Sequence, residues 1–278
     1  MLPDPSAGPP PPRREPAFNL PTVVLVSGAL LFAIHAFLGF LDPQASFDVV
    51  LRFGFVPAAW TIGLDEEAVR VVAENLVATG AGDIARDLAF ARYVLATASD
   101  APWTLVTYAL LHGSWLHVGL NVVWLAAFGS PVARRIGTAR FLALALVCAV
   151  AGALAHWWSH FYEVVPMIGA SAAVSGMMAA AARFAFTPGG GLGFASRPAH
   201  LLPRLSLVEM LANRPAMVFI GIWFAINLVF GVAATPLGLV DGGIAWEAHI
   251  GGFLAGLFLF PLVDSGPRRR DDRANPFA

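Results

Sequence analysis

Charged residues are scarce in this sequence, and that scarcity excludes most soluble proteins of its length. Only 13% of the 278 residues are charged, whereas 58% are hydrophobic, and the mean hydropathy is +0.70. A soluble domain carries about twice that share of charge. The composition therefore predicts an integral membrane protein.

Lysine is absent, and cysteine occurs once. All 17 basic residues are arginine, and 18 acidic residues bring the net charge to −1, which gives no indication of a nucleic-acid partner. Cys148 has no second cysteine in the sequence, so an intramolecular disulfide framework is excluded. Because it lies in an apolar run, we expect it to have a packing role.

Long apolar segments are what the sequence has in abundance. A transmembrane helix needs about 20 apolar residues, and six segments meet this expectation, at roughly 21–41, 112–130, 139–160, 170–186, 215–234 and 244–263. We therefore predict an all-α, polytopic membrane domain of six transmembrane helices over residues 21–263, with a long first outer loop at 42–102. Residues 1–20 contain two proline clusters and are expected to form a disordered cytoplasmic tail, and 264–278 a second cytoplasmic tail. The apolar run after the first tail is long enough to span a bilayer, which argues against a signal peptide.

Arginine placement predicts the orientation of these helices. With a cytoplasmic N-terminus, the inner segments hold Arg13, Arg14, Arg134, Arg135, Arg140, Arg183, Arg197, Arg204, Arg214, Arg268, Arg269, Arg270 and Arg273. The short outer loops hold none, and carry Glu163, Asp241 and Glu247 instead. This is the positive-inside pattern with both termini cytoplasmic, and we expect a multi-pass protein of the bacterial inner membrane. Within the long outer loop, residues 64–78 have helical apolar spacing and are expected to lie at the membrane surface.

Polar residues inside the predicted spans form three clusters, all toward the outer side of the predicted topology. Polar side chains are costly in hydrocarbon, so they usually face a bundle interior or a wet cavity. The stretch LLHGSWLHVGLNVVW supplies His112, His117 and Asn121, the stretch PMIGASAAVSGMMA supplies Ser171 and Ser175, and WEAHIGGFLAGL supplies His249. Their similar depth predicts that the clusters meet.

These residue types suit nucleophilic catalysis. A serine is a weak nucleophile unless a neighbouring base, most often histidine, takes its proton. Gly252 and Gly256 share a helical face with His249, and small residues on such a face allow another helix to approach closely. Both serines lie on one face of the fourth span, so either is a candidate nucleophile. His117 and Asn121, one turn apart, supply donors where an oxyanion would develop.

The three motifs together resemble the rhomboid intramembrane serine proteases over about residues 101–263. The resemblance implies that Ser171 is the nucleophile, that His249 is the general base of a Ser-His dyad, and that His117 and Asn121 line the oxyanion hole. His112, Gly169, Gly252 and Gly256 are then structural residues near the site. The resemblance also implies transmembrane protein substrates cut within the bilayer and no cofactor. Two positions differ from the usual family pattern: Ala172 stands where a glycine is common, and Ser175 where many relatives have an aromatic residue.

Three alternatives stand beside this interpretation. A catalytically inactive rhomboid-like protein would bind membrane clients without cutting them. A metal-dependent hydrolase would recruit His112, His117 and His249, but their spacing is not the i, i+4 spacing of a zinc helix and no acidic ligand accompanies them, so we expect no metal there. A transporter is disfavoured because no repeat of broken helices is present. The remaining histidines are interpreted as packing or interfacial residues, namely His35, His156, His160 and His200. Asn227, in the fifth span, is expected to bond to a neighbouring helix, and the oligomeric state is not indicated.

Overall fold

The fold is known from a computed structural model, which describes residues 20–62, 74, 84–98, 100–187, 199–229, 231 and 245–266. Throughout these residues every regular element is a helix, so the all-α prediction is confirmed. Strand-like pairing among them is limited to one isolated bridge, between Phe55 and Met167.

Each predicted span contains a helix. In chain order these helices are α1 (Thr22–Leu38), the continuous run of α7 (Trp115–Trp124), η2 (Leu125–Gly129) and α8 (Ser130–Ile136), α9 (Thr138–Ser159), α10 (Ser171–Ala185), α12 (Arg214–Leu228) and α13 (Trp246–Val263). Three are long and apolar enough to cross a membrane, over Trp115–Ile136, Thr138–Ser159 and Trp246–Val263, while α1 and α12 are apolar but shorter. The chain is thus an integral membrane protein, and the count of six spans stays a prediction.

The second predicted span begins three residues later than expected, at Trp115 instead of residue 112. Ser114 is extended, and its side-chain oxygen accepts a hydrogen bond from the backbone N–H of His117 at 3.1 Å. A serine in this position satisfies one of the free N–H groups that start a helix. His112 therefore lies in the loop before α7, while His117 and Asn121 lie in its first turns.

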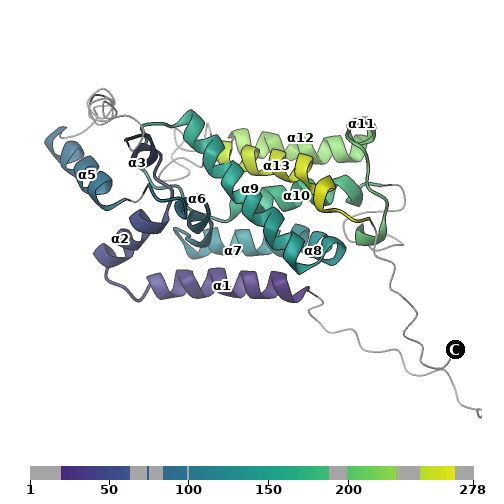
Figure 1. Cartoon of the computed structure of the whole chain (residues 1–278), viewed down its shortest axis with the longest axis horizontal. Helices are drawn as coiled ribbons and strands as arrows, with labels where there is room; N and C mark the ends of the chain where they lie inside the picture. Colours follow the sequence, from purple (N-terminus) through teal and green to yellow (C-terminus); the bar gives the residue numbers. More distant parts are fainter. Residues whose placement is uncertain are drawn as a thin grey trace, which may run out of the picture.

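Helix α10 lies in the centre of the bundle and packs against both α9 and α13, which also pack on each other (Figure 1). Nearly all its residues are buried, and six of the 13 buried residues are alanines. A Cβ atom added to Gly252 would lie 2.1 Å from the carbonyl oxygen of Ala172, and one added to Gly256 would lie 2.1 Å from that of Gly176. These two glycines therefore let the backbones of α13 and α10 touch, as small residues do between membrane helices. Cys148 is fully buried against Gly176, which confirms its packing role.

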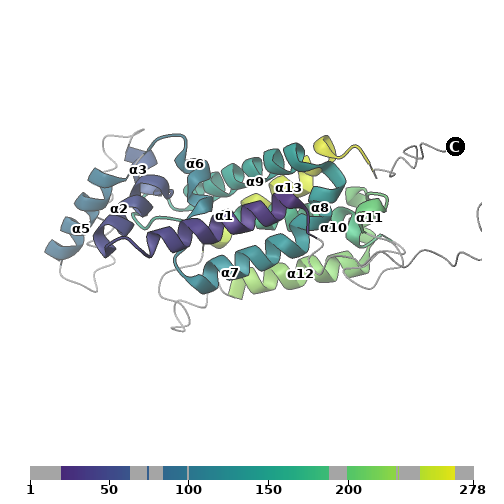
Figure 2. The same cartoon turned by 90° about the horizontal axis from the view of Figure 1, so that it is seen from below.

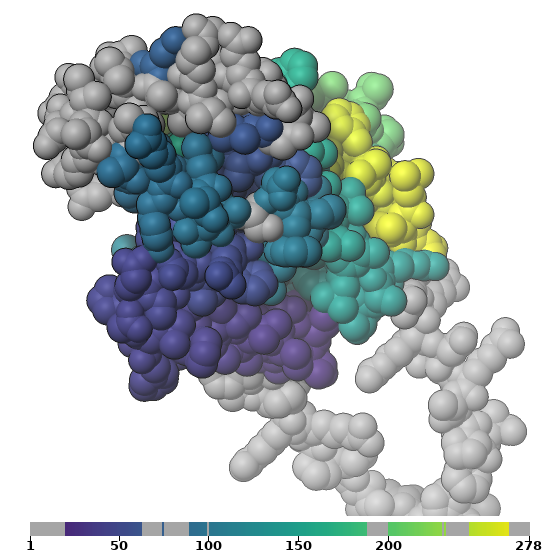
Figure 3. Space-filling view, turned by 60° about the vertical axis from the view of Figure 1, so that its left-hand side comes forward, coloured from purple at the N-terminus to yellow at the C-terminus, as the bar shows by residue number. Residues whose placement is uncertain are grey.

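Helix α1 lies along α7 (Figures 1 and 2). The segment between α1 and α7 contributes shorter helices, namely α2 (Pro43–Phe53), α3 (Pro57–Ile62), α5 (Ile84–Thr97), α6 (Thr104–Thr107) and η1 (Tyr108–Leu110). Helices α2 and α5 pack through Phe47, which stacks on Phe90 and Tyr93 with ring centroids 6.3 and 6.4 Å apart. They form one end of the molecule (Figures 1 and 3). The predicted amphipathic helix at 64–78 falls, except for Glu74, outside the described residues.

The segment between α1 and α7 also contacts the loop that leads into α10. Phe55 and Met167 exchange two backbone hydrogen bonds, at 3.1 and 2.8 Å. The N–H of Ala58 donates to the carbonyl oxygen of Glu163 at 3.0 Å. These bonds fix the chain between α9 and α10, and so fix the point at which Ser171 begins its helix.

Two of the arginines assigned to inner segments, Arg135 and Arg183, are buried. Arg135, 1% exposed, forms two hydrogen bonds with Asp264, from Nε at 2.8 Å and from Nη2 at 3.0 Å. Arg183 donates to the carbonyl oxygens of Leu205 and Leu257, at 3.0 and 2.9 Å. Both guanidinium groups therefore pack at the end of the bundle where η3 (Ala199–Leu201) and α11 (Leu207–Ala212) also lie. Asp264, assigned to the C-terminal tail, is part of this packed end.

We expect Asp264→Asn to destabilise the folded protein by about 3 to 5 kcal/mol, because it leaves the buried Arg135 without a counter-charge. Burial raises the pKa of Asp264, but the hydrogen bonds with Arg135 and the charge of Arg135 lower this pKa by more. The pKa of Asp264 therefore lies below its ordinary value. A lowered pKa gives stability that is present above the unfolded pKa and is lost as pH falls through the folded pKa. Unfolding midpoints measured at several pH values should therefore converge for wild type and variant in acid.

The exposed Asp100 provides the control, since Asp100→Asn should leave the midpoint nearly unchanged. The double variant Arg135→Met with Asp264→Leu should recover part of the loss, because apolar side chains often replace a buried ion pair without cost. If Asp264→Asn matched Asp100→Asn, this ion pair would have no structural role.

Candidate active site

A chain of hydrogen bonds joins three helices inside the bundle. Ser171 is the first residue of α10, His249 lies in the first turn of α13, and Asn227 lies near the end of α12. The Nε2 atom of His249 lies 2.8 Å from Ser171 Oγ, and its Nδ1 atom lies 2.6 Å from Asn227 Oδ1. The serine and the histidine are 78 residues apart in the sequence.

The hydrogen bonds of Asn227 determine which imidazole nitrogen holds the proton. Asn227 Nδ2 donates to the carbonyl oxygen of Trp223 at 2.8 Å, so its Oδ1 is the atom that faces His249. Oδ1 only accepts hydrogen bonds, and Nδ1 of His249 must therefore donate. This leaves the lone pair on Nε2, which accepts from the hydroxyl of Ser171. A neutral histidine in this tautomer is ready to take the serine proton.

Ser171 stands at a helix start that no side chain caps. The preceding residue is Ala170, which has no side-chain oxygen to satisfy the N–H groups of the first turn. Those groups have no acceptor within the helix, and the helix dipole adds partial positive charge at this end. Negative charge that develops beside Ser171 is therefore stabilised by the backbone itself.

Gly169 brings the ring of His117 to the serine. Its φ of +123° is a conformation that residues with a Cβ rarely adopt. A Cβ atom added there would lie 2.7 Å from His117 Nε2 and 3.8 Å from Ser171 Oγ. The absence of a side chain at residue 169 thus leaves room for the imidazole of His117 beside the hydroxyl.

Asn121 and His112 make different contacts near Ser171. Asn121 Nδ2 donates to the carbonyl oxygen of His117 at 3.0 Å and retains a second N–H. His112 is buried behind His117, with ring centroids 4.9 Å apart, and its Nε2 accepts from the N–H of Ala170 at 3.4 Å. His35 reaches the carbonyl oxygen of His112 with Nδ1 at 2.9 Å. His112 therefore supports the turn before α10.

A cavity of about 300 Å³ contains Ser171 and His249 and opens between α7 and α12. Its lining residues are Asn121, Trp124, Ser171, Val174, Ser175, Met178, Phe219, Ile222, Trp223, Ile226, Asn227 and His249. Phe128 and Phe219, with ring centroids 5.6 Å apart, join the α7 to α8 run to α12 near the other end of the bundle. Ser175 also lines this cavity, one turn further into α10, but the serine that hydrogen-bonds to His249 is Ser171.

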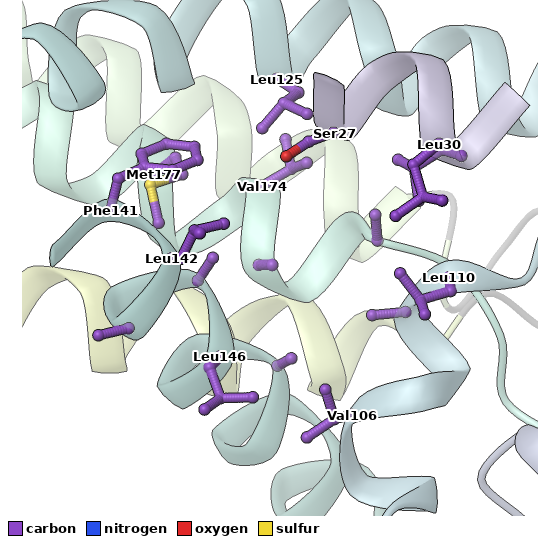
Figure 4. Close-up of a pocket in the computed structure, with 17 residues that line it drawn as sticks. Ser27, Leu30, Val106, Leu110, Leu125, Phe141, Leu142, Leu146, Val174 and Met177 are labelled. Atoms are coloured by element: carbon purple, nitrogen blue, oxygen red, sulfur yellow. The ribbon is translucent and has the colours of Figure 1, made fainter. Parts of the chain in front are cut away.

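A larger cavity, of about 460 Å³, lies on another side of α10, between α1 and α9 (Figure 4). Leu30, Leu142, Leu146 and Met177 are among its lining residues, and Ser27 is the one polar side chain in it. It contains no acid or base, so it offers no route to hydrolysis.

Ala172 fits its position because α9 has a glycine opposite it. The residue is 1% exposed, and a Cβ atom added to Gly152 would lie 2.4 Å from the Cβ of Ala172. The same added atom would lie 3.2 Å from the hydroxyl of Tyr108. The departure from the usual glycine is thus accommodated by Gly152, without displacing Ser171.

The arrangement is that of a helical membrane protein with a serine-hydrolase-like chain of Ser, His and Asn. A model of the Rhomboid domain matches residues 99–264. The chain belongs to the rhomboid family.

The chain is similar to three curated relatives from distant organisms. It is 39% identical over 56 residues to Rhomboid protease GlpG of Pectobacterium atrosepticum, covering 20% of each chain. It is 25% identical over 175 residues to Rhomboid protein 1, mitochondrial, of Saccharomyces cerevisiae, covering 60% of this chain and 44% of the relative. Over 270 residues it is 24% identical to RHOMBOID-like protein 5 of Arabidopsis thaliana, covering 92% of this chain and 74% of the relative.

The chain spans less than half the length of the first two relatives. Relatives named as proteases support intramembrane proteolysis as the function at the level of the family. The relatives include a plant protein, and the expected bacterial inner membrane is not supported.

Asn227 is the site residue whose contact with His249 the sequence did not reveal. A bond to a neighbouring helix was expected, but the partner was not identified. The available signal was its depth: it is an amide near the outer end of the fifth span, the depth predicted for His249.

Proposed function

We propose that this chain is a serine endopeptidase that cleaves transmembrane proteins in or near their membrane segments. The observation that supports this most directly is the hydrogen bond of 2.8 Å between His249 Nε2 and Ser171 Oγ. A serine and a histidine at this distance meet the geometric requirement for an activated nucleophile.

The reaction begins when Nε2 of His249 removes the hydroxyl proton of Ser171. Oγ then attacks the scissile carbonyl carbon, and the carbonyl oxygen becomes an oxyanion. His249 returns the proton to the leaving amine as the C–N bond breaks, which leaves an acyl-enzyme on Ser171. A water molecule, deprotonated by the same imidazole, then hydrolyses the ester. Asn227 Oδ1 accepts from Nδ1–H throughout, and so stabilises the imidazolium formed in each half.

The oxyanion is stabilised by groups that surround Ser171. The free N–H groups at the start of α10 point to the serine, the second N–H of Asn121 borders the same cavity, and His117 lies beside the hydroxyl across Gly169. Donors fixed in advance are worth more than donors that must reorient, because they need no rearrangement when charge develops.

The substrate segment enters from the side, between α7 and α12. The cavity there is bordered mostly by apolar and aromatic side chains, with polar atoms at Asn121, Ser171 and Asn227. An apolar entrance suits a transmembrane segment, and the polar groups at its inner end suit the peptide bond to be cut.

The orientation that we propose has both termini in the cytoplasm and the active site toward the outer side. Ser171 begins α10, whereas Arg183 lies near its other end, where Arg135, Arg204 and Asp264 also gather. Positive charge at the end away from the site agrees with cytoplasmic placement of that end. Residues 1–20 and 264–278 remain the proposed tails, the second beginning at the packed Asp264, and 42–102 remains the proposed outer loop.

An inactive client-binding protein is the second candidate, motivated by Ala172. Ala172 packs against Gly152 without displacing Ser171, and a protein with no catalytic role has no need for the hydrogen bonds among Ser171, His249 and Asn227. These contacts favour the protease.

The purified full chain, reconstituted in vesicles, should react with a fluorophosphonate probe and cut a reporter protein with one transmembrane segment. His249→Ala should do neither, because no base remains to activate Ser171. Binding of the reporter to the variant, measured by crosslinking, controls for folding. If the wild-type chain binds the reporter but neither reacts nor cuts, the client-binding candidate is correct.

A further inference from the structure

Two histidines and two glutamates meet where α9 ends and α13 begins, away from the Ser-His-Asn chain. His156 lies in the last turn of α9, His160 follows one turn later, Glu163 lies in the next loop, and Glu247 lies in the first turn of α13. The ligand atoms of His156, His160 and Glu163 all lie within 4.8 Å of one another. From the sequence, both histidines were interpreted as packing or interfacial residues. The reaction proposed above uses none of these four residues.

Two atoms in this cluster are buried without a hydrogen-bond partner. They are Nδ1 of His156, a residue 5% exposed, and Oε2 of Glu163. His156 Nδ1 lies 3.8 Å from a carboxylate oxygen of Glu247, and His156 Nε2 lies 3.5 Å from Glu163 Oε2. These distances are too long for hydrogen bonds. An unsatisfied buried polar atom in a native protein calls for an explanation, and for Glu163 Oε2 an ion is one of the few available. An ion on Nε2 of His156 would leave the proton on Nδ1, which faces the Glu247 carboxylate.

The hydrogen bonds of His160 leave its Nε2 free to bind a cation. Its Nδ1 lies 3.3 Å from the carbonyl oxygen of His156, and a carbonyl can only accept, so Nδ1 donates. In the neutral imidazole, the lone pair on Nε2 then faces Glu163 Oε2 at 3.9 Å and Glu247 Oε1 at 3.8 Å. Lone pairs and carboxylates that face one another repel unless a positive charge lies between them. A backbone carbonyl on the second nitrogen is also the usual support of a metal-bound histidine.

The separations between these atoms suit a divalent metal. Zinc binds histidine nitrogen and carboxylate oxygen at about 2.0 to 2.2 Å, which places tetrahedral ligands about 3.3 to 3.6 Å apart. The three histidine–carboxylate separations of 3.5 to 3.9 Å need to contract by only a few tenths of an ångström, while the ligand atoms of His156, His160 and Glu163 all lie within 4.8 Å of one another. The two histidines have the i, i+4 spacing that presents a zinc pair, and two carboxylates balance the charge of a divalent ion.

We propose that His156, His160, Glu163 and Glu247 form a binding site for a divalent transition metal of the zinc type. His156 Nε2, His160 Nε2 and a Glu163 oxygen are the ligands, and Glu247 supplies the fourth. The metal joins the end of α9, the loop that leads to α10, and the first turn of α13. The metal therefore stabilises the fold where α10 and α13 begin, whether or not the chain cleaves proteins.

The test uses the full chain, purified in detergent with a tag that contains no histidine, and treated with a chelator. Zn²⁺ binding is measured by calorimetry, and Co²⁺ is used as a spectroscopic substitute, since its visible bands report four-coordinate nitrogen and oxygen ligands. We expect one ion per chain and a higher unfolding midpoint with Zn²⁺, as for any ligand that binds only the folded state. Mg²⁺ should have no such effect, because it prefers oxygen ligands.

Two variants and one control assign the site. The variants His160→Ala and Glu163→Gln change half-exposed side chains, so both should fold. Each should weaken Zn²⁺ binding by more than 10- to 100-fold, the loss that is typical when a residue behind a metal ligand is removed. His200→Ala, at the other end of the bundle, should bind as wild type does. Unchanged Zn²⁺ affinity in both cluster variants would overturn the proposal. An unfolding midpoint that responds to pH but not to Zn²⁺ would also overturn it, because protonated histidines alone would then pair with the carboxylates.

Discussion

Ser171→Ala should abolish fluorophosphonate labelling and lower turnover by about 10⁶, the loss seen when other serine nucleophiles are removed. The reason is that the hydroxyl bonded to His249 Nε2 at 2.8 Å is the only group at that point able to form the acyl-enzyme. Turnover is measured on a single-span reporter in vesicles, and labelling on the same preparation.

The neighbouring serine provides a matched control. Ser175 lines the same cavity, is also buried, and lies one turn away on the same helix. Ser175→Ala should therefore keep measurable labelling and cleavage. The opposite result, with labelling retained in Ser171→Ala and lost in Ser175→Ala, would transfer the role of nucleophile to Ser175.

The sequence predicted the helices well because each was identified by a local property. Apolar length located six segments, and every segment contains a helix. The helix bounds differ where capping decides them, as at Ser114, which starts α7 after His112 instead of before it. Length alone could not establish that each helix spans the membrane, since α10 has only 15 residues and is enclosed by other helices.

The contacts that depend on three-dimensional packing were not predictable in the same way. Arginine counts placed Arg135 and Arg183 in inner segments but did not predict their burial, because a count does not distinguish a solvated guanidinium from one paired inside a helix end. The partner of Arg135 is Asp264, 129 residues away. The fit of Ala172 could not be predicted either, since it depends on Gly152 in another helix.

The meeting of Ser171 and His249 was reached from the sequence by two independent routes, depth in the membrane and similarity to a family. The family motifs do not include Asn227. Its depth matches that of His249 but does not identify a partner, because a single amide in a span has many roles. Ser175 stands where many relatives have an aromatic residue that stacks on the histidine. Here the histidine is held from its other side, by the hydrogen bond between Nδ1 and Asn227 Oδ1.

Asn227→Leu should lower turnover by about 10² to 10⁴. The upper value is the loss seen in serine proteases when the residue that hydrogen-bonds to the catalytic histidine is changed so that the histidine adopts the wrong tautomer. Leucine has a similar size but no acceptor, so His249 Nδ1–H loses its partner and Nε2 is no longer held as the base. Asn227→Asp restores an acceptor at the same position and should recover most of the turnover. Fluorophosphonate labelling rates and steady-state cleavage measure both effects.

A control variant distinguishes an effect on the orientation of His249 from an effect on the shape of the cavity. Ile226, the preceding residue on α12, lines the same cavity but has no polar atom in its side chain. Ile226→Ala should raise KM for the reporter while changing kcat little, whereas Asn227→Leu should lower kcat with KM nearly constant. If leucine and aspartate at residue 227 reduced kcat equally, the hydrogen bond to Nδ1 would not be what orients His249. The residue would then act only as a wall of the cavity between α7 and α12.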